Sequence, residues 1–271
     1  MKLPVHIEII QRQDSTLTRD ALRIYIKKMV DDEGFITPGM TIQNMNSPIF
    51  EEHVQAIYIS ELPTEHEKER VSISELNIKY HVYRLDNAGP QPEVMDEEED
   101  ITAANHWVLP SSDFHGLWES LIYDSGIKEN LLSFVETTLL FSDREVDTNI
   151  VSWNRVVLLH GPPGTGKTSL CKALAQKLSI RLADRYRHGQ LVEINSHSLF
   201  SKWFSESGKL VMKMFEKIRE LIEDKEALVC VLLDEVESLA HARSASLSSS
   251  EPSDSLRVVN AVLTQIDQMK R

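Results

Sequence analysis

The glycine-rich segment from Gly161 to Thr168 constrains the fold of this chain more than any other feature. It reads Gly-Pro-Pro-Gly-Thr-Gly-Lys-Thr and fits the Gly-x-x-x-x-Gly-Lys-Thr pattern at every required position. The apolar run 156–159 precedes it, and Leu170, Leu174 and Leu178 follow at helical spacing. A strand, a glycine loop and a helix in this order predict a phosphate-binding βα unit within an α/β fold.

The side chains of this loop are those that a bound triphosphate needs. Glycines allow the backbone to curl so that its N–H groups point at phosphate oxygens, and the following helix adds a positive dipole end. Lys167 supplies an ammonium for the β- and γ-phosphates, and Thr168 supplies a hydroxyl for Mg²⁺. We therefore expect ATP and Mg²⁺ as cofactors. The expected nucleotide contacts are Gly161, Pro162, Pro163, Gly164, Thr165, Gly166, Lys167 and Thr168.

A pair of carboxylates follows a second apolar segment. The run Val231-Leu232-Leu233 leads directly into Asp234 and Glu235. A buried strand would deliver Asp234 to its carboxyl end, where the carboxylate can orient Mg²⁺ and its waters. Glu235 can act as the general base that polarises the attacking water. An Asp-Glu pair after a strand is a weak signal alone, but together with the loop it predicts a hydrolytic site.

An aromatic pair, Trp203-Phe204, lies between a predicted strand and a predicted helix. Lys, Ser and Gly residues flank it. Composition leaves two interpretations equally open: a loop that grips an extended polypeptide, or an aromatic pair packed in the core.

The pattern of strands, helices and turns divides the chain into three parts. Residues 1–92 contain strand and helix patterns that predict a small α+β domain, with a helix starting at Thr18. Residues 93–110 include an acidic run after several Pro and Gly residues, which predicts a linker. Residues 111–271 carry the phosphate loop. In this last part the predicted helices are 114–123, 127–140, 168–178, 210–221 and 256–266, and the predicted strands are 156–159, 191–194 and 227–233.

Composition narrows the classes of partner. The formal net charge is −13, which argues against direct binding of nucleic acid through Lys and Arg. No apolar run approaches the ~20 residues of a membrane span, and Met1–His6 lack the apolar stretch of a secretory signal. The 2 cysteines, Cys171 and Cys230, are expected to be buried reduced thiols in the cytosol or the nucleus.

Several motifs together resemble the AAA+ ATPases, and more narrowly the pachytene checkpoint protein 2 family, also called the thyroid hormone receptor interactor homologs. The broader resemblance rests on the phosphate loop, the Asp-Glu strand and the stretch from Arg257 to Asp267. The narrower one rests on 104–110, 114–118, 194–200 and the Trp203-Phe204 pair. The resemblance is strong over about 101–271. The first domain resembles the family's N-terminal domain only in its type of fold and its position in the chain.

The resemblance implies a homo-hexameric ring that remodels HORMA-domain proteins, which a comet-type adaptor presents to the N-terminal domain. It implies action in the spindle checkpoint and in meiotic chromosome synapsis and recombination, in the nucleus and cytoplasm and on chromosomes. Trp203 and Phe204 match the family's substrate-gripping pore loop. His115, Gly116 and Leu117 fall where such proteins cover the adenine.

The sequence departs from the AAA+ pattern after its third strand. AAA+ domains order their strands five-one-four-three-two, and the sequence ends at Arg271 after the third strand and its helix. The expected fold is therefore an AAA+ large subdomain that is incomplete at its C-terminus. In such a fold the predicted strand 156–159 lacks a neighbouring strand on one side. An unpaired buried backbone group costs about 1–3 kcal/mol. We expect this chain alone to be a poor ATPase.

Three functions compete at this point. The first is an ATP-driven protein remodeller. The second is a truncated, non-catalytic module that binds an adaptor through residues 1–92 or competes with complete subunits. The third is a nucleic-acid ATPase of the clamp-loader type, against which the acidic composition argues.

Overall fold

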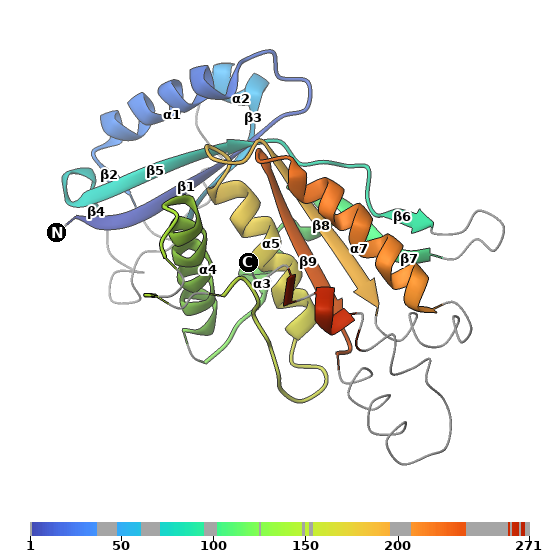
Figure 1. Cartoon of the computed structure of the whole chain (residues 1–271). Helices are drawn as coiled ribbons and strands as arrows, with labels where there is room; N and C mark the ends of the chain where they lie inside the picture. The colour runs from blue at the N-terminus through green and yellow to red at the C-terminus, as the bar shows by residue number, and fades with distance from the viewer. Residues whose placement is uncertain are drawn as a thin grey trace, which may run out of the picture. The chain divides into compact units, whose positions relative to one another are not determined.

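The computed structural model divides the chain into two compact units (Figure 1). The first consists of residues 1–87 together with 180–183, and the second of residues 88–179 together with 184–271. The structure describes residues 2–36, 48–60, 71–94, 102–124, 126–147, 150–151, 154–195, 207–236, 260, 262–265 and 267–268. Within these ranges, no helix is both long and apolar enough to span a bilayer.

The first unit is built on a three-stranded sheet in the order β3-β1-β5. Strand β1 (Leu3–Gln11) pairs antiparallel with β3 (Val54–Ser60) and parallel with β5 (Leu76–Tyr83). The remaining elements of this unit are α1 (Arg19–Glu33), β2 (Phe35–Ile36), α2 (Pro48–His53), β4 (Val71–Ser72) and the 3₁₀ turn η2 (Ile73–Glu75).

Helix α1 begins where its sequence predicts. The Thr18 hydroxyl accepts a hydrogen bond from the N–H of Ala21 at 3.2 Å, which satisfies one of the donors left open at a helix start. Gly34 ends the helix in the left-handed conformation that glycine tolerates best. Leu22, Ile26 and Val30 recur at helical spacing, and all three are buried. The predicted helix after Thr18 is therefore confirmed.

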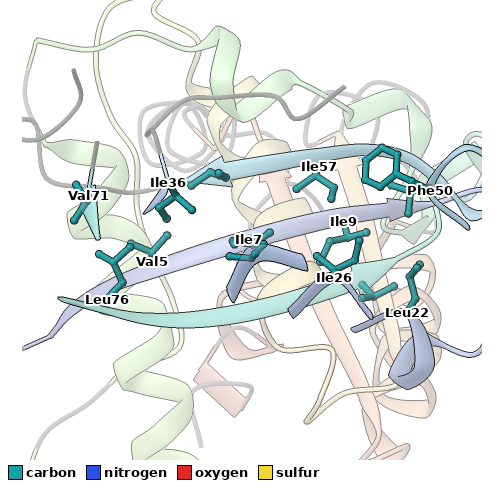
Figure 2. Close-up of a cluster of buried hydrophobic side chains, with 14 residues drawn as sticks. Val5, Ile7, Ile9, Leu22, Ile26, Ile36, Phe50, Ile57, Val71 and Leu76 are labelled. Carbon is teal, nitrogen blue, oxygen red and sulfur yellow. The ribbon is translucent and has the colours of Figure 1, made fainter. Parts of the chain in front are cut away.

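Strand β1 is the centre of the first core (Figure 2). Val5, Ile7 and Ile9 are fully buried in one cluster with Leu22 and Ile26 of α1. The residues between them are buried as well, which includes the polar side chains of His6 and Glu8. The sequence interpretation of a half-buried strand is wrong, because apolar residues cover both faces: one core cluster packs on Val5, Ile7 and Ile9, and a second cluster packs on Ile10.

The second unit is built on a four-stranded sheet in the order β6-β7-β8-β9. Strands β8 (His188–Asn195) and β9 (Ala227–Asp234) are parallel, as expected for the strands of an α/β domain. Strand β7 (Thr102–Leu109) pairs antiparallel with β8, and β6 (Gln91–Val94) pairs antiparallel with β7. The prediction of a linker over 93–110 is therefore wrong where β6 and β7 form, because the backbone groups of these strands are paired in the sheet.

Helix α5 (Lys167–Arg181) packs on the sheet of the second unit. This unit also contains η3 (Ser112–Phe114), α3 (Leu117–Ser120), α4 (Ile127–Asp143) and α7 (Ser207–Glu223). One core cluster joins Ala175 of α5 to Leu191 of β8 and Leu232 of β9. The predicted helix 114–123 is replaced by two short turns, because Gly116 adopts a left-handed conformation between them.

The apolar run 156–159 does not form the predicted strand. None of the strand pairings among the described residues includes it. Val156, Val157 and Leu158 are 40, 39 and 72% exposed. A strand is held by hydrogen bonds to a neighbouring strand, and without one its backbone stays outside the sheet.

Gly189 lies where the sheet and the end of α5 approach most closely. A Cβ placed on it would lie 2.8 Å from the Cβ of Ser179 and 3.0 Å from the Cβ of Leu109. We predict that Gly189→Ala lowers the free energy of unfolding by about 1–3 kcal/mol, the usual cost of overpacking, measured by urea titration. Gly126→Ala is the control, since its nearest contact would be 3.6 Å away. Equal stability of the two variants would contradict the close packing at Gly189.

Candidate nucleotide-binding site

The backbone of the loop 161–166 requires glycine at two positions. Gly164 and Gly166 have φ values of 75° and 80°, a region that residues with a Cβ rarely adopt. A Cβ on Gly166 would also lie 3.2 Å from the hydroxyl oxygen of Tyr123 and 3.3 Å from Leu121 Cδ2. The loop is therefore shaped both by its own glycines and by a neighbouring segment that presses against it.

Lys167 is bonded to its own loop. Its Nζ donates to the carbonyl oxygens of Gly161 at 3.0 Å and Pro162 at 2.8 Å, and Thr165 Oγ1 donates to the same Pro162 oxygen at 2.9 Å. Lys167 is also the first residue of α5, and the first N–H groups of a helix have no partner within it. This combination of positive charge and N–H donors suits a phosphate.

A hydrogen bond connects the start of α5 to the end of β9. The hydroxyl of Thr168 donates to Asp234 Oδ2 at 3.0 Å, and both residues are half-buried. Side chains alternate along a strand, so Asp234 lies on the same face of β9 as Leu232 and Cys230, which pack in the cluster that contains Ala175 of α5. This alternation aims the carboxylate at the helix.

Glu235 follows directly after the strand. Its φ of 54° is left-handed, and its N–H donates to Asp234 Oδ1 at 2.9 Å. Both carboxylate oxygens of Asp234 are thus engaged, one by Thr168 and one by the Glu235 backbone. The Glu235 residue itself is exposed.

The residues present fit a magnesium-bound triphosphate. Mg²⁺ is usually held by one or two carboxylates together with phosphate oxygens and waters, rather than by a cage of protein ligands. Thr168 and Asp234 offer one hydroxyl and one carboxylate side by side. Throughout the described ranges, no group of three or more His, Cys, Asp and Glu residues forms a cage for a metal.

The predicted adenine segment lies beside α5. His115 and Gly116 are exposed, whereas Leu117 packs against the cluster that includes Ala175 and Cys171. The sequence did not identify Leu121 and Tyr123 as neighbours of the phosphate loop. Nothing in their pattern signals it, because the contact joins segments 42 to 43 residues apart.

Both cysteines pack against the same cluster of the second unit. Burial, and secondarily the negative charge of Asp234, raise the pKa of Cys171 to about 11. Burial alone raises the pKa of Cys230 to about 12. Both thiols therefore stay neutral at physiological pH, and neither is a candidate nucleophile.

The predicted loop of Trp203 and Phe204 lies outside the described residues, as does much of the predicted helix 256–266.

The loop, the helix behind it and the adjoining Asp-Glu strand define a P-loop nucleotide-binding domain. The family model for the ATPase family associated with various cellular activities (AAA) matches residues 157–271, and the TRIP13 N-terminal domain matches residues 1–88. The chain belongs to the pachytene checkpoint protein 2 family of AAA ATPases.

Relatives match almost the whole of this chain. The chicken and human pachytene checkpoint protein 2 homologs are 57 and 56% identical to it over 98% of its length. The chain spans 62% of the length of each. The structure of C. elegans PCH-2 is similar with a TM-score of 0.75 and 39% identity, over all of this chain and 65% of that one.

The raised thiol pKa values predict slow alkylation. Moving the pKa of Cys171 from 9.0 to about 11 reduces its thiolate about 100-fold, so iodoacetamide at pH 8 should label the native protein at least ~10-fold more slowly than the urea-unfolded chain. Asp234→Asn should speed labelling of Cys171 but leave Cys230 unchanged, as followed by peptide mass spectrometry. Labelling of native Cys171 at the unfolded rate would contradict the burial of its thiol.

Proposed function

We propose that this protein binds and hydrolyses ATP at the 161–168 loop and uses the cycle to remodel HORMA-domain proteins. The observation that carries the nucleotide part is the 3.0 Å hydrogen bond between Thr168 and Asp234. It brings together a helix start and a strand end that lie far apart in the sequence. The two halves of the candidate hydrolytic site thus form one unit.

Each residue of the site has a distinct part in this proposal. The loop N–H groups and the ammonium of Lys167 bind the β- and γ-phosphate oxygens and neutralise their charge. Thr168 and Asp234 hold Mg²⁺, which supplies further positive charge at those oxygens. Glu235 accepts a proton from the water that attacks in line with the γ-phosphate. His115, Gly116 and Leu117 cover the adenine.

The left-handed backbone at Glu235 supports its part in this chemistry. A non-glycine residue in that region costs about 1–3 kcal/mol and persists where the surroundings hold it. Here the bond from Glu235 N–H to Asp234 Oδ1 holds the turn. It orients the two carboxylates in relation to each other, one bonded to Thr168 and the other exposed.

The substrate side of the proposal rests on family membership. We infer a homo-hexamer whose Trp203 and Phe204 grip substrate in a central pore, with the first unit receiving HORMA-domain proteins through a comet-type adaptor. The match of residues 1–88 to the TRIP13 N-terminal domain supports the role of the first unit in receiving substrate. Action in the spindle checkpoint and in meiotic synapsis and recombination, in the nucleus, the cytoplasm and on chromosomes, belongs to the same proposal.

One observation favours a second candidate function. In the run 156–159, which leads into the phosphate loop, Val156, Val157 and Leu158 are exposed, and no strand pairing among the described residues includes the run. A loop whose preceding segment is not anchored holds a triphosphate less firmly. A chain in this state would act as a non-catalytic module that binds an adaptor through its first unit. Capture of the adaptor with no ATP turnover would favour this function.

Two substitutions separate nucleotide binding from hydrolysis. Lys167→Ala should weaken ATP binding by at least about 10-fold, because it removes a charged hydrogen-bond donor to phosphate. Glu235→Gln should bind ATP normally but lower turnover by about 10²–10⁴-fold, because it removes the base. Calorimetry measures the first effect and phosphate release the second, in a complete family member that carries these residues. Normal turnover by Glu235→Gln would remove Glu235 from this role.

The aromatic pair provides a test of substrate gripping. Trp203→Ala should abolish conversion of a HORMA-domain substrate while leaving ATP affinity within about twofold, because only the apolar contact with substrate is lost. Trp203→Phe is the matched control and should retain most of the activity. Conversion of substrate by Trp203→Ala at the wild-type rate would show that the pore loop does not grip through this residue.

A further inference from the structure

The segment 111–123 lies along helix α5 and is tied to it at several points. Near the start of the helix, the Tyr123 hydroxyl lies 3.5 Å from the carbonyl oxygens of Thr165 and Gly166. One turn further, Leu117 packs in the cluster that includes Cys171. Two polar contacts at Gln176 and Lys177 complete the series. The segment thus follows the helix from the phosphate loop to its last turns.

The first polar contact is a pair of hydrogen bonds between Gln176 and the backbone of Ser111. The Ser111 N–H donates to Gln176 Oε1 at 2.9 Å, and Gln176 Nε2 donates to the Ser111 carbonyl oxygen at 2.9 Å. Both residues are buried, with 1% of Ser111 and 5% of Gln176 exposed. A buried side-chain amide that satisfies both backbone groups of one residue fixes that residue's place on the helix.

The second polar contact is the ion pair between Lys177 and Glu119. Lys177 Nζ lies 3.1 Å from Glu119 Oε1, and the lysine side chain is only 3% exposed while that of Glu119 is 53% exposed. Burial opposes ionisation of Glu119, but the lysine charge prevails and holds the pKa of this carboxyl below its usual range. A lysine buried to this degree depends on its carboxylate partner.

These contacts lie far from the phosphate loop itself. Gln176 and Lys177 follow Lys167 by nine and ten residues, which corresponds to roughly 14–15 Å along an α-helix. Neither side chain can therefore reach a phosphate held at Lys167. Their printed side-chain contacts are instead with Ser111 and Glu119, at either side of the segment that carries His115, Gly116 and Leu117.

We propose that Gln176 and Lys177 are positioning residues, which fix the segment carrying His115, Gly116 and Leu117 on helix α5 and thereby set the affinity for the base of the nucleotide. This inference rests on the proposed function, in which 115–117 cover the adenine. The ion pair and the Ser111 contact act on the base end of the ligand, whereas Lys167 acts on its phosphates. The helix thus holds both ends of the nucleotide in one rigid frame.

The proposal separates ligands that have a base from ligands that lack one. Glu119→Ala should weaken binding of ATP and ADP by about 10-fold but leave binding of inorganic tripolyphosphate within twofold, measured by calorimetry on the purified protein. Glu129→Ala removes the same charge at an exposed position of α4 and should change neither affinity. Gln176→Met removes the contact with Ser111 and should weaken ATP and ADP binding as Glu119→Ala does. The double variant Glu119→Lys/Lys177→Glu reverses the ion pair and should restore the affinity for ATP.

Each result has a definite consequence. Thermal unfolding first checks that Glu119→Ala and Gln176→Met are folded. If these variants bind ATP as the wild type does, or lose affinity for ATP and tripolyphosphate equally, the positioning role is overturned. The proposed nucleotide site stands in either case. Lys167→Ala serves as the reference for that site and should lose both ligands. Equal binding of tripolyphosphate by the wild type and Lys167→Ala would overturn the proposed nucleotide site, and the positioning role with it.

Discussion

The hydrogen bond from Thr168 to Asp234 is the contact on which the candidate site depends. It joins the first turn of α5 to the last residue of β9 at 3.0 Å. The bond forms because alternate residues of β9 face α5, so that Cys230 and Leu232 pack in its cluster and Asp234 follows on the same face. Packing of apolar side chains thus carries the carboxylate of Asp234 within hydrogen-bonding distance of Thr168.

The same helix organises the surroundings of the loop. Lys172 of α5 forms an ion pair with Glu193 of β8 at 2.7 Å, which anchors the helix to the sheet. Further along the helix, Gln176 and Lys177 hold the segment 111–123. Near its start, Gly166 accepts the close approach of Tyr123, which any larger residue would obstruct. Helix α5 is therefore the common support for the phosphate, metal and base parts of the proposed site.

The edge of the second sheet shows where sequence interpretation failed. Residues 102–109 follow an acidic run, and that composition favoured a linker. Yet Trp107 and Leu109 alternate into the core beside Leu191, and the strand pairs with β8 along its length. The run 156–159 shows the opposite failure. Its apolar residues predicted a strand, but strand formation requires a partner, and none of the described strands pairs with it.

The sequence by itself determined the phosphate loop, the Asp-Glu pair and the helices α1, α4 and α5, because each follows from local chemistry. Glycine permits a left-handed backbone, Thr18 caps α1, and the apolar residues of α1 at helical spacing bury one face of that helix. Only the tertiary structure decided that Thr168 meets Asp234, that Tyr123 lies on Gly166 and that β7 completes the sheet. These are contacts between residues distant in the sequence. They depend on which strands pair and which faces pack, and a local pattern carries no information about either.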